Sequence, residues 1–279
     1  MSVLHAIVLG VTQGVTEFAP VSSSGHLILV PWLLGWGRFE DPGLAKAFDV
    51  ALHLGTLAGA LAFFRHDVGR YLGAWLRSIR RRGIATVDER LAWALAVGTV
   101  PGAVVGATLE GFIEARLGAP WLVATMLAAF GVLLYVVDRR SASDRGLDDL
   151  TVGRGLLLGL AQAAALQPGV SRSGVTITAA RALGLDRASA ARFSFLLSLP
   201  IIAGAGLFKA VDVLRGGLGP HAAAFGWGFA ASAASGFLTI RFLLSFLPRG
   251  GFGPFVVYRL AFAALVLGLL VGGLRPPAA

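Results

Sequence analysis

The chain contains six stretches of mostly apolar residues that are each long enough to cross a lipid bilayer. A helix needs about 20 such residues to span the hydrocarbon core. Only 14% of the 279 residues are charged, compared with about 25% in a soluble domain. We therefore predict an all-α polytopic membrane protein. Its six transmembrane helices lie at 47–64, 91–109, 121–137, 190–208, 222–247 and 255–274.

Two further apolar stretches, 3–36 and 154–185, are interrupted near the middle by a proline and a cluster of serine and glycine. A break in a helix at membrane depth is tolerated only where protein or water satisfies the exposed backbone groups. We predict that each stretch is a re-entrant helix–loop–helix segment, which enters the membrane and turns back.

These two interrupted stretches also resemble each other. Residues 9–25 read LGVTQGVTEFAPVSSSG and residues 158–174 read LGLAQAAALQPGVSRSG, with seven identities and no gap. Three predicted crossings separate the copies, and an odd number places them on opposite sides of the membrane. This is the inverted-repeat arrangement, in which broken helices meet near the midplane. The predicted parts of the single membrane domain 1–279 are a first repeat 1–137, a cytoplasmic linker 138–153 and a second repeat 154–279.

The charge distribution predicts the orientation. The chain carries a net charge of +9, but its arginines lie in short loops between apolar stretches, which indicates topology and not nucleic-acid binding. The loop at 65–90, the linker and Arg249 hold most of them and fall on one side, which the positive-inside rule makes cytoplasmic. The first interrupted stretch then opens outward. The chain has no cysteine, which excludes disulfides, thiolate metal sites and cysteine nucleophiles.

Gln13 and Glu17 are the first polar pair inside apolar sequence, and their spacing of four puts both on one face of a helix. A carboxylate within a membrane segment is costly and indicates a functional site. The structural alternative is that Glu17 pairs with a helix end or an arginine, and that Gln13 only bridges helices through hydrogen bonds.

A serine-rich turn follows, Ser22-Ser23-Ser24-Gly25-His26. Backbone N–H groups in such turns, and at the start of the next helix, bind anions. His26 lies beside the hydroxyls and nine residues after Glu17, so that it can serve as base, acid or nucleophile. The alternative reading of the serines is a helix cap.

The second copy places a cation where the first has a hydroxyl, because Arg172 takes the position of Ser23. Arginine grips phosphate with a fork of donors, although a structural pair with Glu17 is also compatible with the pattern. An acid–base set opposite an anion clamp is what phosphoryl transfer requires. The neighbouring residues expected at the phosphate are Gly169, Ser171, Ser173 and Thr176.

Asp49 and His53 form a second pair four residues apart, in the stretch 47–64. They could support the site or help to bind a metal, and an ordinary structural pair is an equal alternative. Two side chains rarely make a metal site. A Mg²⁺ or Ca²⁺ ion that bridges substrate phosphates remains compatible with the sequence, since such ions take few protein ligands.

These motifs resemble those of the undecaprenyl-diphosphate phosphatase family associated with bacitracin resistance. One motif runs from Gln13 to His26 (QGVTEFAPVSSSGH), and the other runs from Pro168 to Thr176 (PGVSRSGVT). The similarity extends over the whole chain in the length and order of its spans, and the two motifs at this separation are highly specific.

The resemblance implies an enzyme that removes the terminal phosphate of undecaprenyl diphosphate and so regenerates the lipid carrier for cell-wall synthesis. It implies Glu17, His26 and Arg172 as essential residues, and Ser23 as nucleophile or phosphate donor. It assigns to the phosphate site the residues Ser22, Ser24, Gly25, Gly169, Ser171, Ser173 and Thr176. It also implies a divalent cation, Mg²⁺ or Ca²⁺, and a multi-pass protein of the bacterial cytoplasmic (inner) membrane, with its site open to the periplasmic face.

One position departs from many family members, which carry glutamate where this chain has Gln13. Either Glu17 suffices, or Asp49 supplies a second negative charge for a metal. The expected partners are the prenyl diphosphate and the bilayer, with no nucleic acid, and a homodimer is compatible with the sequence. The alternative function is an inverted-repeat transporter or lipid flippase, because that class shows the same pattern of spans.

Overall fold

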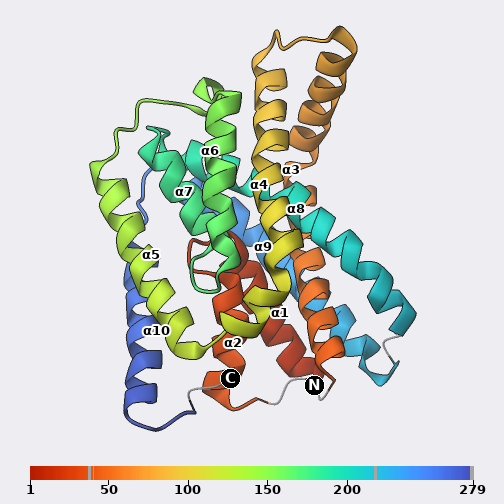
Figure 1. Ribbon diagram of the computed structural model, residues 1–279, viewed down its shortest axis with the longest axis vertical. Helices are drawn as coiled ribbons and strands as arrows, with labels where there is room; N and C mark the ends of the chain where they lie inside the picture. The colour runs from red at the N-terminus through yellow and green to blue at the C-terminus, as the bar shows by residue number, and fades with distance from the viewer. Residues whose placement is uncertain (37–38, 40, 217–218, 277–279) are drawn as a thin grey trace.

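Figure 1 shows the protein, a computed structural model, as a bundle of helices. The structure describes all residues except 37–38, 40, 217–218 and 277–279, and it does not describe the side chains of 42, 110, 113–115 and 207–219. Within the described parts, every regular element is a helix, and one isolated β-bridge joins Arg145 to Leu185. The helices are α1 Val3–Phe18, α2 Ser23–Leu34, α3 Pro42–Arg81, α4 Val87–Arg116, α5 Pro120–Arg140, η1 Leu147–Asp149, α6 Val152–Ala163, η2 Ala164–Leu166, α7 Arg172–Ala182, α8 Arg187–Gly216, η3 Gly219–His221, α9 Ala222–Phe246 and α10 Gly253–Val271.

Six of these helices, α3, α4, α5, α8, α9 and α10, are long and apolar enough to cross a membrane, which confirms the six predicted spans. The distribution of exposed and buried side chains also agrees with a protein that lies in a membrane. Large apolar residues such as Leu238 and Val257 lie on the surface, while Glu17 and Arg259 are buried. A soluble domain would bury the apolar residues, so this chain is a multi-pass membrane protein.

Both interrupted stretches are broken at the predicted places. The first divides into α1 and α2, and the second divides into α6 with η2 and α7. Ser22 and Ser171 cap α2 and α7 with the same rare backbone conformation, φ 76° and 75°, and each side-chain oxygen accepts a hydrogen bond from the N–H three residues later. The two copies therefore share a local structure as well as a sequence.

The broken helices pack backbone to backbone against spanning helices. A Cβ atom on Gly10 of α1 would lie 2.4 Å from the carbonyl oxygen of Gly228 in α9, and one on Gly159 of α6 would lie 2.1 Å from that of Gly98 in α4. Only glycine fits such close approaches, which are typical of helix pairs in membranes. Gly10 and Gly159 are equivalent positions of the two copies, so both broken helices are held by the same kind of contact.

Helix α3 is longer than the predicted span because it continues beyond a kink at Phe64. With α4 it forms a hairpin that projects at the top of Figure 1, opposite the N-terminus. Trp75 and Trp93 pack against each other in this hairpin, and the Trp93 indole donates to Ser78 Oγ at 2.8 Å.

The linker is shorter than the predicted 138–153, since α5 runs to Arg140 and α6 begins at Val152. Asp138 is a buried residue of α5, and its carboxylate accepts hydrogen bonds from Arg181 at 2.8 Å and from Arg187 at 2.9 Å. This ion-pair cluster holds the last turn of α5 against the end of α7 and the start of α8, which is why the helix does not end at Val137.

Candidate active site

The two breaks meet inside the bundle. The N–H of Gly169 donates to Ser22 Oγ at 3.1 Å, and Ser173 Oγ donates to the carbonyl of Ala19 at 3.0 Å. The contacts bring the N-termini of α2 and α7 together. The first N–H groups of a helix have no acceptor within it and carry the positive end of its dipole. The junction is therefore suited to an anion.

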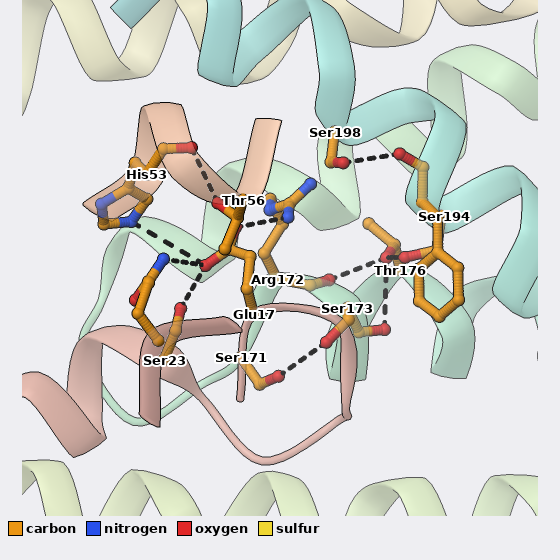
Figure 2. A network of polar contacts seen from close by, with 12 residues as sticks. Glu17, Ser23, His53, Thr56, Ser171, Arg172, Ser173, Thr176, Ser194 and Ser198 are labelled. Atoms are coloured by element: carbon orange, nitrogen blue, oxygen red, sulfur yellow. Dashed lines mark hydrogen bonds and ion pairs between the residues drawn. The ribbon is translucent and has the colours of Figure 1, made fainter. Parts of the chain in front are cut away.

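Glu17 lies at the centre of the polar network that Figure 2 shows. Its carboxylate accepts hydrogen bonds from Ser23 Oγ at 2.5 Å, from Arg172 Nη2 at 2.6 Å and from Gln13 Nε2 at 2.9 Å. The Glu17 residue is buried, with 5% of its surface exposed. Four predicted site residues from both copies of the repeat are thus in direct contact.

His53 of α3 also reaches this carboxylate, with its Nε2 atom 3.8 Å from Glu17 Oε2. Its Nδ1 atom is hydrogen-bonded to the main-chain carbonyl of Asp49 at 2.7 Å. The two residues of the predicted pair therefore have different places. The His53 side chain lies at the edge of the network, and the main-chain carbonyl of Asp49 orients the His53 ring.

Two polar atoms of the network have no hydrogen-bond partner in the described structure, namely Arg172 Nη1 and Gln13 Oε1. Both are buried, and a buried polar atom without a partner costs about 1–3 kcal/mol or more when charged. The site therefore presents one unmet cationic donor and one unmet oxygen acceptor, which a bound anion and a bound cation or water could satisfy.

No hydrogen bond or ion pair joins His26 to Glu17 in the described part of the chain. Among the described residues, its Nδ1 atom pairs with the carbonyl of Ser22 and its Nε2 atom with the hydroxyl of Tyr258, both at 2.7 Å. Phe262 stacks on the ring with a centroid distance of 4.7 Å. Tyr258 was not predicted as a site residue, because an aromatic residue in an apolar span has no distinctive sequence signal.

Arg259, the next residue of α10, was also missed. It is completely buried, and its guanidinium donates to the carbonyls of Pro20 at 3.0 Å and Gly169 at 2.9 Å, one from each break. Further bonds reach the main chain of α5 and Val170. A signal was present, since Arg259 stands in an apolar span that contains no acidic residue, and an intramembrane charge indicates function.

The remaining predicted residues line the breaks with one exception. The hydroxyls of Ser22 and Ser24 lie 3.5 Å apart, and those of Ser171 and Ser173 lie 3.3 Å apart. The exception is Thr176, whose hydroxyl is hydrogen-bonded to the hydroxyl of Ser194 in α8 at 2.5 Å.

The two predicted glycines both lie where the backbone is crowded. At Gly25, a Cβ would lie 3.1 Å from a methyl group of Val123. At Gly169, where φ is +95°, a Cβ would lie 2.4 Å from the carbonyl oxygen of Val123. A side chain would therefore push the breaks away from α5.

Comparison of the whole chain with known proteins identifies its family. The family model described as Bacitracin resistance protein BacA matches residues 6–265. An undecaprenyl-diphosphatase of Desulforudis audaxviator is 48% identical over 276 residues, which cover 98% of this chain and 100% of the relative.

Two further relatives are also named as undecaprenyl-diphosphatases. An undecaprenyl-diphosphatase of Pelotomaculum thermopropionicum is 49% identical over 96% of both chains. Undecaprenyl-diphosphatase 2 of Stutzerimonas stutzeri is 47% identical over 98% of this chain and 100% of its own length. With both motifs inside the matched region and in contact around Glu17, this chain belongs to the BacA bacitracin resistance protein family.

Proposed function

We propose that this protein is an undecaprenyl-diphosphate phosphatase, which removes the terminal phosphate and regenerates undecaprenyl phosphate for cell-wall synthesis. The observation that carries the proposal is the contact of Glu17 with both Ser23 and Arg172. It combines a base, a nucleophile and a phosphate-binding cation from two distant segments. The names of the three relatives support hydrolysis over the transporter or flippase alternative.

Arg172 is the phosphate clamp of this proposal. One of its terminal nitrogens is paired with Glu17 and the other is buried without a partner in the described structure. A guanidinium binds two oxygens of a phosphate side by side. The paired N-termini of α2 and α7 and the buried charge of Arg259 add positive potential at the same place. Substrate binding then exchanges the Glu17 carboxylate for phosphate oxygens.

Ser23 is the nucleophile that the geometry supports best. Its hydroxyl already donates to Glu17, which is the arrangement of a nucleophile with its base. Glu17 takes the hydroxyl proton while Oγ bonds to the terminal phosphorus. The bond from that phosphorus to the bridging oxygen breaks, and undecaprenyl phosphate leaves with that oxygen. Water then hydrolyses the phosphoserine, releasing inorganic phosphate and returning a proton to Oγ.

A divalent cation, Mg²⁺ or Ca²⁺, is part of the proposal. The described residues contain no cluster of three or more His, Cys, Asp or Glu side chains, so a complete protein cage does not fit. The carboxylate of Glu17 and the unpaired Oε1 atom of Gln13 are suitable oxygen ligands for an ion whose other ligands are water and phosphate. Such an ion would neutralise phosphate charge. Asp49 stays a predicted ligand.

The two broken stretches are proposed to be re-entrant segments of an inverted repeat, 1–137 and 154–279. The equivalent caps at Ser22 and Ser171 and the equivalent contacts of Gly10 and Gly159 support this arrangement. The arginines of the α3–α4 hairpin and of the linker favour a cytoplasmic position for that end of the molecule. The site then opens to the periplasmic face of the inner membrane, where the prenyl tail can stay in the bilayer.

The test is phosphate release from a C55 or C15 prenyl diphosphate by the purified protein, with and without EDTA. We expect metal-dependent release, and a loss of at least about 100-fold for Ser23→Ala and Arg172→Ala. Ser245→Ala, in an exposed serine of α9, is the matched control. Near-normal release by Arg172→Ala would contradict the assignment.

The alternative and the assembly are tested separately. The flippase alternative is tested by measuring transport of prenyl phosphate into liposomes. The Ser23→Ala variant is used so that hydrolysis does not contribute, and transport without any phosphate release by the wild-type protein would favour the flippase. The homodimer stays a prediction, which light scattering of the detergent-solubilised protein would check.

A further inference from the structure

A cavity of about 490 Å³ opens at the end of α5, and none of its lining residues belongs to the network around Glu17. Its walls come from the last turns of α5, the linker and the end of α7, on the same side of the molecule as the α3–α4 hairpin (Figure 1). Val136 and Leu183 are apolar parts of the lining, and Arg140 and Arg145 are its cationic parts. The cavity therefore offers both an apolar and a positively charged surface.

The walls of this cavity are fixed by hydrogen bonds. Arg181 Nη1 donates to the carbonyl of Ala142 at 3.1 Å and to Ser143 Oγ at 2.8 Å. The main-chain N–H of Arg145 donates to the carbonyl of Gly184 at 3.2 Å. These bonds tie the linker to the turn between α7 and α8, so the cavity is preformed, as binding sites usually are.

The charges in the cavity are only partly neutralised. Within the described part of the chain, Arg140 has neither a hydrogen bond nor an ion pair from its side chain. The Arg145 guanidinium donates from Nη1 to the neutral carbonyl of Leu183 at 2.7 Å. Asp144 also lines the cavity, and among the described residues no ion pair joins it to either arginine. Two cations against one carboxylate leave the cavity with a net positive charge, which attracts an anion.

The cavity lies at the level of the lipid head groups. Helix α5 has 21 residues and is therefore about 30 Å long, which is the thickness of the hydrocarbon core. Trp121 at its start is exposed, as is typical of the aromatic belt, so Arg140 at its end falls at the opposite interface. Val132, Val136 and Arg140 follow at intervals of four residues and share one helix face. Val132 is exposed, so this face leads from the lipid to the arginine.

We propose that this cavity binds the phosphate group of an anionic phospholipid, with its acyl chains along the exposed face of α5. Arg140 is the main contact of the phosphate and Arg145 is the second. A guanidinium binds two phosphate oxygens side by side, and basic pockets between membrane helices bind anionic head groups. A phospholipid fits better than free phosphate because the cavity is continuous with an apolar face. The site is separate from the phosphatase function above.

The first test is native mass spectrometry of the purified protein in detergent, with phosphatidylglycerol or phosphatidylcholine added at equal concentration. We expect phosphatidylglycerol to be retained in preference. Arg140→Gln should lower its affinity at least about fivefold, the effect of one arginine on an anionic lipid. Arg139→Gln is the matched control and should keep the wild-type affinity, because Arg139 lies over the ring of Tyr135 and does not line the cavity. Equal retention of the two lipids, or equal affinity in the two variants, would overturn the site.

A second pair of variants leaves both arginines in place. Ala182 is an exposed residue of the cavity lining, and Ala182→Glu adds a carboxylate there. Ala182→Gln has the same shape without the charge. We expect phosphatidylglycerol to bind more weakly to Ala182→Glu than to Ala182→Gln. This comparison decides the proposal even where Arg140→Gln fails to fold, and equal binding by the two variants would count against a phosphate in the cavity.

A third measurement distinguishes a lipid from free phosphate. A ligand that binds the folded protein raises its Tm. We expect phosphatidylglycerol to raise the Tm of the wild-type protein and of Arg139→Gln more than that of Arg140→Gln. Inorganic phosphate and glycerol phosphate at the same concentration should leave the Tm unchanged. If they raise it as much as the lipid does, and only with Arg140 present, then the site takes free phosphate and the lipid proposal is wrong. These readouts need no phosphate release, so a failure of the phosphatase function would leave them intact.

Discussion

Replacing Glu17 by glutamine should separate catalysis from phosphate binding. The amide keeps the shape of the carboxylate and can still accept a hydrogen bond from Ser23, but it cannot take up the hydroxyl proton. Loss of a general base lowers the rate by about 10²–10⁴-fold. We therefore expect kcat to fall by that factor in Glu17→Gln.

Binding should change in the opposite direction, because Arg172 must leave Glu17 to bind phosphate. Their contact is 2.6 Å long, with side chains that are 16% and 4% exposed. A hydrogen bond between charged groups contributes about 1.5–3 kcal/mol, and a neutral acceptor keeps about half of that. The remaining half, released for the ligand, corresponds to an affinity that is about 3- to 13-fold higher. Removing a negative charge near the phosphate acts in the same direction.

The assay is titration of the detergent-solubilised variant with a prenyl monophosphate, with EDTA present so that no metal contributes, alongside kcat for the diphosphate with metal present. Glu89→Gln is the matched control, since Glu89 is another buried glutamate paired with an arginine, Arg81 in the α3–α4 hairpin. Weaker or unchanged monophosphate binding by Glu17→Gln would refute the exchange of Glu17 for phosphate.

Three further changes test the framework of the site. Gly159→Ala should lower the free energy of unfolding by about 1–3 kcal/mol through overpacking, because its Cβ would meet Gly98, whereas Gly69→Ala has open space and should not; thermal unfolding in detergent compares them. Ser22→Ala removes a helix cap, which costs about 1 kcal/mol, and the acceptor of a bond between the breaks, so both Tm and kcat should fall. Arg259→Lys keeps the charge but loses the fork that reaches both breaks, so kcat should fall at least about tenfold; wild-type kcat in that variant would show that the breaks do not need the fork.

The spans and the central contact of the site could be predicted from sequence because both follow from composition and pairing. Long apolar stretches have few alternatives to a membrane helix. Arg172 and Glu17 carry opposite charges, and they are expected to pair because an unpaired charge inside a membrane is costly. The repeat, visible between 9–25 and 158–174, indicated which two segments would meet.

The placement of individual side chains could not be predicted in the same way. His26 and Ser23 are three residues apart on α2, yet the serine bonds to Glu17 and the histidine bonds to Tyr258, which is more than 200 residues away in the chain. Thr176 turned toward α8 because Ser194 offers it a partner there. The hydrogen-bond partner of each side chain depends on tertiary neighbours, which a local sequence pattern does not specify.

The glycine contacts have a consequence for how such a molecule can change over time. At Gly10 and Gly159 the two broken helices are fixed by main chain against main chain. A joint of this kind does not depend on the identity of any larger side chain. The two similar segments can therefore keep the same glycine contact while their functional positions differ, since one carries the hydroxyl of Ser23 and the other carries the guanidinium of Arg172.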